Sequence, residues 1–244
     1  MSALPSLKSL MGQHVTPVYS LRALAHLLTY PNAELRAALP ELREALNAEH
    51  ALPAKRLQGL ELLIEVLSSR DPIEVEAEYV ELFDRGRSTS LHLFEHVHGD
   101  SRDRGPAMID LLKTYEQGGL YLDPAQVAGE LPDYLPVVLE FTSTLAIEQM
   151  QGFVAEFAHI LNALYAALLK RRSLYAHVVA AVLELANQAL QAVEVPEDEA
   201  LDASWAEPEA FGGCSSKGQQ SPDQPQPIQI VRRASSGAQR GASA

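Results

Sequence analysis

The stretch FVAEFAHILNALYAALLKRR, residues 153–172, repeats its apolar side chains at intervals of three and four, which indicates the fold class of the chain. This spacing places the large side chains on one face of a helix. The members of that face are Phe157, Ile160, Leu161, Leu164 and Leu168. A second helix with the same period is expected over residues 173–193. No segment alternates with period two between hairpin turns, so we predict an all-α protein.

The same helical period continues toward the N-terminus and predicts one globular domain over residues 17–202. Asp71-Pro72 is a helix start, with a carboxylate cap before a proline. Pro40 lies inside another helical pattern and is expected to kink or split it. Residues 1–16 are expected to form a flexible arm. Residues 203–244 are rich in Gly, Ser, Gln, Pro and Ala, a composition typical of a disordered tail.

Composition excludes several classes of function. The formal net charge of −13 over 244 residues disfavours nucleic acid as a partner. One cysteine, Cys214, excludes an internal disulfide and a cysteine-based metal site within the chain. No run of 18 uninterrupted apolar residues predicts a transmembrane helix, and the N-terminus is a poor signal peptide. We therefore expect a cytoplasmic protein without stable membrane insertion.

The segment Tyr79–Gly105 (YVELFDRGRSTSLHLFEHVHGDSRDRG) is denser in charge than a helical core requires. It contacts a partner, holds a metal, or braces neighbouring helices. The metal candidates are His92, His96 and His98, because histidines four apart share a helix face. The competing interpretation is that these histidines pack against or hydrogen-bond neighbouring helices. No HExxH, GxSxG or GxxxxGK[ST] motif is present, so neither hydrolytic nor nucleotide chemistry is indicated.

Several acidic residues stand beside large apolar residues. They are Glu78, Glu81, Asp84, Glu95, Asp133 and Glu140. A groove with an apolar floor and an acidic rim would accept a basic amphipathic peptide. Solvated helix faces are the usual place of such acids, and the spacing alone does not favour the groove over that interpretation.

Residues 79–120 resemble the signature of the NarJ-type nitrate reductase assembly chaperones, the delta subunit family. The segments LLTYPNAEL, DPIEVEAEYVELF, ELPDYLPVVLEF and ALDASWAEPEAF add to the likeness. The resemblance implies a single all-α domain of the molybdoenzyme-chaperone type, a class that includes the TorD- and DmsD-type proteins. It also implies a chaperone that is not an enzyme and carries no cofactor of its own.

The implied partner is the apo catalytic alpha subunit of respiratory nitrate reductase, bound through its N-terminal leader, and by extension the alpha–beta complex. The chaperone would hold this client in the cytoplasm while the molybdenum cofactor is inserted, before membrane attachment. A family motif lining the peptide groove corresponds to Asp133–Pro136, with Tyr134 where a histidine is frequent. The implied client-binding residues are Glu81, Leu82, Phe83, Leu91, Phe94, Glu95, Asp133, Leu135 and Glu140.

In this hypothesis the apolar members receive the client helix and the acids meet its basic residues. Asp133→Lys is then expected to weaken leader binding without unfolding the domain. Two alternatives remain: a metal-dependent enzyme using His92, His96 and His98, and a helical scaffold subunit that stays in the mature complex.

Overall fold

The computed structural model describes residues 16–85, 87–99, 101–122, 130–191 and 193. Its helices are α2 (Val18–Leu27), α3 (Ala33–Ala48), α4 (Ala54–Ser69), α5 (Pro72–Phe83), η1 (a 3-10 helix, Arg87–Thr89), α6 (Leu93–His98), α7 (Arg104–Gln117), α8 (Leu135–Ser143), α9 (Ile147–Lys170) and α10 (Ala176–Leu185). These described residues contain no strand, which confirms the predicted all-α class. The predicted tail lies outside them, as does the predicted arm apart from Thr16.

Polar caps fix the starts of two helices. The Asn32 side chain accepts the Leu35 N–H at 2.9 Å, and Asp71 accepts the N–H groups of Ile73 and Glu74 before α5. Each cap satisfies backbone donors that have no partner inside their own helix. The start predicted at Asp71-Pro72 is therefore confirmed.

Pro40 does not split α3, so that part of the prediction was wrong. The helix runs through Pro40 from Ala33 to Ala48. Pro40 lies on the exposed face, where water can hydrate the Arg36 carbonyl that loses its intrahelical partner. Leu35 and Leu39 on the opposite face stay buried. Burial of that face holds the helix together across the proline.

The two long C-terminal helices differ in extent from the prediction. α9 begins at Ile147, because Met150 and Val154 continue its buried face toward the N-terminus. α10 ends at Leu185, and Asn187 follows with a φ of 55°, a left-handed conformation that asparagine tolerates better than most residues.

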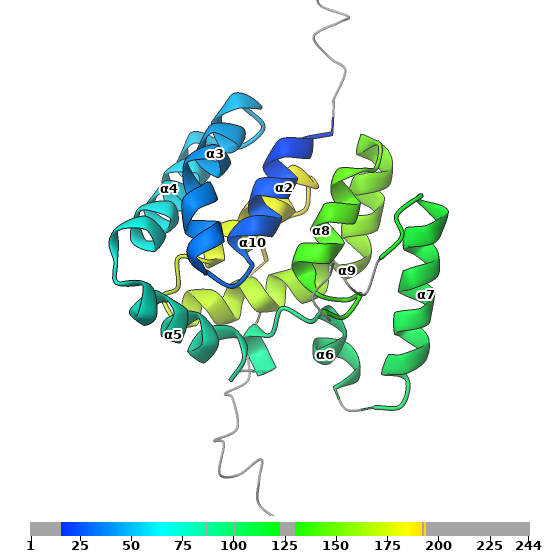
Figure 1. The fold of residues 1–244 in the computed structure, drawn as a ribbon. Coiled ribbons are helices and arrows are strands. Elements are labelled where there is room, and N and C mark those ends of the chain that lie inside the picture. The colour runs from blue at the N-terminus through cyan, green and yellow to red at the C-terminus, as the bar shows by residue number, and fades with distance from the viewer. Residues whose placement is uncertain (1–15, 86, 100, 123–129, 192, 194–244) are drawn as a thin grey trace, which may run out of the picture. The chain divides into compact units, whose positions relative to one another are not determined.

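α2 lies at the centre of the core. Figure 1 shows it between α3 and α8 with α10 behind it, and it packs against all three. Leu21, Leu24, Leu27 and Leu28 are wholly buried. Full burial of one such side chain contributes roughly 1.5–3 kcal/mol, so this helix is a main source of stability.

α9 is long and apolar enough by composition to cross a membrane, with a mean hydropathy of 1.5 over its best window. In the structure it packs against α10, α8 and α6. Its residues Met150, Val154 and Leu161 are wholly buried in the domain core. These contacts are those of a core helix.

Candidate functional site

The charged segment that follows α5 is tied to the start of α8 by backbone hydrogen bonds. The Leu93 N–H donates to the Asp133 carbonyl at 3.0 Å, and the Leu135 N–H donates to the Leu91 carbonyl at 2.8 Å. His92 and Tyr134 form the isolated antiparallel bridge between the two segments. Residues 91–93 and 133–135 are therefore held in register, although about 40 residues separate them in sequence.

Asp133 is the centre of a buried polar cluster beneath this bridge. Its side chain is fully buried, and its Oδ2 accepts the Phe94 N–H at 2.9 Å. Its Oδ1 lies 3.3 Å from His92 Nδ1, and Arg104 Nη2 lies 3.6 Å from Oδ2. Because α6 cannot satisfy its own first N–H groups, the carboxylate acts as a cap supplied by another segment. We call Asp133, His92, Phe94 N–H and Arg104 the carboxylate brace.

Glu95 extends the carboxylate brace toward α7. One of its oxygens accepts the Ser90 hydroxyl at 2.5 Å, and the other lies 3.3 Å from Arg104 Nη1. The hydrogen bond to Asp133 raises the pKa of His92, an effect that burial of the ring partly offsets. Of the three roles open to this segment, bracing is the one these contacts demonstrate.

The three histidines do not converge. His96 Nε2 donates to the Ser90 carbonyl at 2.8 Å, and the His98 ring packs edge-on against Phe94. His92 turns instead toward Asp133. Across the part of the chain that the structure describes, no three His, Cys, Asp or Glu side chains are grouped to hold a metal. The three histidines therefore form no shared site among the described residues.

Two adjoining hollows of about 370 and 170 Å³ lie next to the carboxylate brace, and His92 of the brace lines the smaller one. Both are lined by Tyr30, Tyr134 and Glu130, so we treat them as one surface, the tyrosine groove. The larger hollow is completed by Ala25, His26, Thr29, Asn32, Pro136, Val137 and Glu140. The smaller is completed by Tyr79, Phe83, Asp84, Leu91 and His92.

The walls of the tyrosine groove are fixed by the core. The Tyr79 hydroxyl donates to the Leu28 carbonyl at 2.7 Å, and the Tyr134 hydroxyl lies 3.4 Å from that of Tyr79. The His92 and Tyr134 rings lie 5.3 Å apart, and Tyr30 meets Tyr79 edge-on. Burial raises the pKa of Tyr134, so its hydroxyl stays protonated at neutral pH.

Carboxylates surround this aromatic surface. Glu130 and Glu140 keep 44% and 39% of their side-chain surface exposed, and Asp84 also lines the groove. Glu140 lies 3.4 Å from Arg22, so part of its charge is already neutralised. Glu130 has no ion-pair partner closer than His92 at 4.0 Å among the residues that the structure places. A basic side chain at the groove would meet mainly Glu130 and Asp84.

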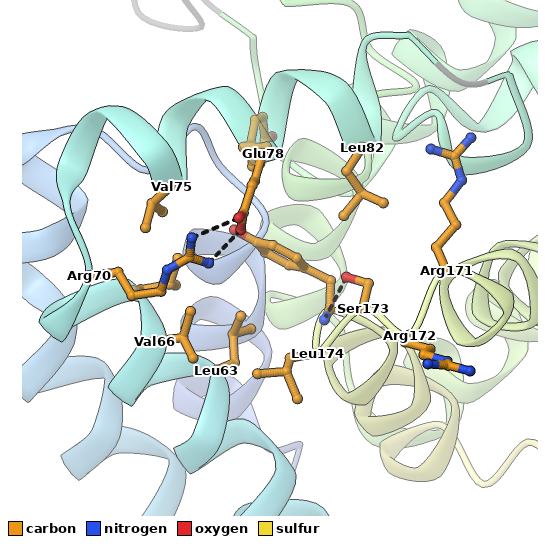
Figure 2. Close-up of a pocket in the computed structure, with 13 residues that line it drawn as sticks. Leu63, Val66, Arg70, Val75, Glu78, Leu82, Arg171, Arg172, Ser173 and Leu174 are labelled. Carbon is orange, nitrogen blue, oxygen red and sulfur yellow. Dashed lines mark hydrogen bonds and ion pairs between the residues drawn. The ribbon is translucent and has the colours of Figure 1, made fainter.

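The predicted client-binding residues are distributed over several environments. Phe83 and Leu91 line the smaller hollow and Glu140 lines the larger. Leu82 belongs to a different cleft, between α4, α5 and the turn that joins α9 to α10 (Figure 2). The remaining five face elsewhere: Glu81 pairs with Arg85 on the surface, Phe94 packs against the core, Glu95 and Asp133 belong to the brace, and Leu135 is fully buried.

This distribution changes what Asp133 is expected to do. A wholly buried carboxylate cannot meet a client's basic residue at the surface, so its effect on binding must pass through the carboxylate brace. The expectation that Asp133→Lys leaves the domain folded conflicts with that burial. The main groove residues that sequence reasoning missed are Tyr30 and Glu130, whereas Tyr134 belongs to the groove-lining motif that the family resemblance implies. A tyrosine next to a helix end, with its apolar ring and polar tip, was the available signal.

The fold of this chain is similar to that of a known class of helical proteins. A solved structure from Archaeoglobus fulgidus, described as a redox enzyme maturation protein, matches with a TM-score of 0.51. The match covers 77% of this chain and 98% of that one, at 16% sequence identity. At this identity the likeness establishes the fold alone: a single all-helical domain of the type used by that protein.

Sequence relatives make the assignment specific. The family model described as nitrate reductase delta subunit matches residues 29–181. The nitrate reductase molybdenum cofactor assembly chaperone NarJ of Escherichia coli is 43% identical over 194 residues, covering 75% of this chain and 80% of the relative. A Bacillus subtilis protein described as a probable NarJ is 34% identical over 167 residues, covering 66% and 86%.

The chain therefore belongs to the nitrate reductase delta subunit family. The two relatives named above are described as assembly chaperones, and this chain is accordingly a chaperone and not an enzyme. The resemblance first seen in residues 79–120 is confirmed.

Proposed function

We propose that this chaperone binds the N-terminal leader of the catalytic alpha subunit of respiratory nitrate reductase. Binding takes place in the cytoplasm, keeps the apo subunit or the alpha–beta complex ready for molybdenum cofactor insertion, and precedes membrane attachment. The names of the relatives support nitrate reductase as the client. The observation that carries the proposal is the tyrosine groove, which combines aromatic walls with an acidic rim.

The chemistry of the groove suits a short, basic, amphipathic helix. Such a peptide inserts apolar side chains at i, i+3 and i+4 into a hollow and keeps its charges at the edge. The two hollows hold a few anchoring side chains but not a whole helix. Tyr30 and Tyr134 offer large rigid contact surfaces, and residues of this type carry much of the binding energy at interfaces.

The acidic rim contributes steering and orientation more than affinity. Glu130 and Asp84 border the smaller hollow, while Glu140 lies at the larger one. Basic residues at two points of the leader would meet these acids and set its direction. Release then requires that the mature enzyme bind this groove more weakly than the immature client does, because a partner shifts an equilibrium only by its differential affinity.

Calorimetric titration with the synthetic leader of the cognate alpha subunit tests the proposal. Glu130→Lys reverses an exposed rim charge and is expected to weaken binding about tenfold. Glu156→Lys makes the same change on an exposed face of α9 and is expected to leave affinity within about twofold. Equal effects of the two variants would show that net charge, not the groove, governs binding.

A pull-down from nitrate-respiring cells separates the chaperone from the scaffold alternative. Recovery of catalytic subunit lacking its molybdenum cofactor is the expected result. Stoichiometric recovery with the mature membrane-bound enzyme would instead support a permanent scaffold subunit.

A further inference from the structure

The tyrosine groove has a long axis, because α2 and α8 run antiparallel along its larger hollow. Tyr30, which follows α2, and Tyr134, which caps the start of α8, line both hollows. Further along, Arg22 Nε on α2 lies 3.4 Å from Glu140 and 3.3 Å from Ser143 Oγ on α8. The end of α2 thus meets the start of α8, and the start of α2 meets the end of α8. At about 1.5 Å per residue, the helix from Tyr134 to Glu140 covers roughly 9 Å of this axis.

The two ends of the groove differ in the space that they leave for a chain. Tyr79, Phe83 and Leu91 bound the smaller hollow, and none of them is more than 5% exposed. That hollow, of about 170 Å³, is smaller than the pockets of roughly 300–1,000 Å³ that hold drug-sized ligands, so it suits a single anchoring side chain. At the other end the Arg22 side chain is 51% exposed. A leader continues into the rest of its client, so its C-terminal end needs the open end of the groove.

The two ends also differ in charge. Asp84 lines the smaller hollow, and Glu76 accepts the Tyr30 hydroxyl at 2.9 Å. The hydrogen bond to Glu76 raises the pKa of Tyr30, and the negative charge of Asp84 contributes, so both carboxylates act on this part of the groove. Glu130 borders both hollows. Within the described residues, none of these three carboxylates forms an ion pair with a lysine or an arginine.

At the open end the one carboxylate of the lining is already matched. Glu140 lies 3.4 Å from Arg22, and His26 Nε2 lies 3.9 Å from the other oxygen of Glu140. The potential along the groove therefore changes from clearly negative beside Asp84 to nearly balanced beside Arg22.

The N-terminal end of a leader is positive whatever its sequence. Its first residue carries an α-amino group with a pKa of about 7.7–8.0, which is mostly protonated at neutral pH. A bound helix adds about half a positive charge at its N-terminus and about half a negative charge at its C-terminus. The acidic end of the groove favours the first of these, and Arg22 favours the second.

We propose that the leader binds in one direction, with its N-terminal end over Asp84, Glu76 and Glu130 and its C-terminal end beside Arg22. Its first large apolar side chain enters the smaller hollow, and the following ones lie along α2 and α8. The proposal rests on the leader binding proposed above and adds the direction. The reverse direction would place the α-amino group beside Arg22 and turn the continuing chain against the wall of the smaller hollow.

Photo-crosslinking of the full chain with two leader peptides reads this direction. One peptide carries benzoylphenylalanine at its first residue and the other at its last, and mass spectrometry maps the labelled segment. The first probe is expected to label residues 76–92, and the second residues 18–26. Reversed or intermixed labelling by peptides that bind in calorimetry would overturn the direction alone. Failure of both peptides to bind would overturn the leader binding itself, and the direction with it.

Acetylation of the α-amino group of the leader gives a second test with a matched control. It is expected to weaken binding to the wild-type chain about threefold to tenfold at pH 7. Asp84→Asn combined with Glu130→Gln should reduce that difference to less than about twofold, because both exposed carboxylates at the acidic end are neutralised. Glu140→Gln combined with Glu156→Gln removes the same number of charges elsewhere and should preserve the difference. An acetylation effect that survives the first pair of changes, or that disappears with the second, contradicts the proposed direction.

Discussion

Replacing Asp133 by alanine should be among the most damaging single changes to this domain. The substitution removes the acceptor of the Phe94 N–H and leaves His92 and Arg104 without their buried counter-charge. Removing one partner of a buried charge cluster costs about 3–5 kcal/mol. A typical domain is stable by roughly 5–15 kcal/mol, so the variant would lose a large fraction of its stability. Asp133→Asn keeps an oxygen for the Phe94 N–H and should lose about half as much.

Chemical denaturation followed by circular dichroism measures this cost. Asp110→Ala is the control, because the Asp110 side chain is 75% exposed and pairs with Lys113 on the surface. Its cost should not exceed about 0.5 kcal/mol. The expected order of stability is wild type and Asp110→Ala, then Asp133→Asn, then Asp133→Ala. An Asp133→Ala variant within about 1 kcal/mol of wild type would refute the carboxylate brace as a stabilising cluster.

Three further predictions concern His92 in the carboxylate brace and two glycines elsewhere in the domain. His92 has a raised folded-state pKa, so its pairing with Asp133 stabilises the fold fully below the unfolded value near 6.5 and is lost as pH rises through the folded value. An NMR titration should place its pKa above that of an unfolded peptide, and Asp133→Asn should lower it; an unshifted pKa contradicts the pairing. A Cβ at Gly118 would lie 2.4 Å from the buried Phe141 ring, so Gly118→Ala should cost about 1–3 kcal/mol. Gly152→Ala, with open space around its Cβ inside α9, should instead stabilise by about 0.4–1 kcal/mol in thermal melts.

Local and periodic signals could be read from the sequence because they depend on neighbours in the chain. The cap at Asp71 and the apolar face of α9 are examples, and both appear as predicted. The prediction that Pro40 splits its helix was wrong, because the effect of a proline depends on which face of α3 is buried. That property is set by contacts with other helices.

The candidate site was harder to predict, because the tyrosine groove is assembled from segments far apart in the chain. Tyr30 follows α2, whereas Glu130 and Tyr134 come about 100 residues later. An acid beside an apolar residue in sequence is compatible with a rim, a cap or an ion pair. Asp133 became a cap and Glu81 a surface partner of Arg85. Only the three-dimensional arrangement distinguishes these roles.

The carboxylate brace and the tyrosine groove are two sides of one structural unit. The bridge that seats Asp133 under α6 also fixes His92 and Tyr134, whose rings line the smaller hollow. A change at Asp133 therefore reaches the groove through the positions of these rings, not through contact with a client. Leader affinity in Asp133→Asn should consequently fall together with local order at His92. Glu130→Lys should instead lower leader affinity and leave the fold intact, because that carboxylate is exposed. Measuring stability and affinity on both variants separates a residue that builds the groove from one that touches its ligand.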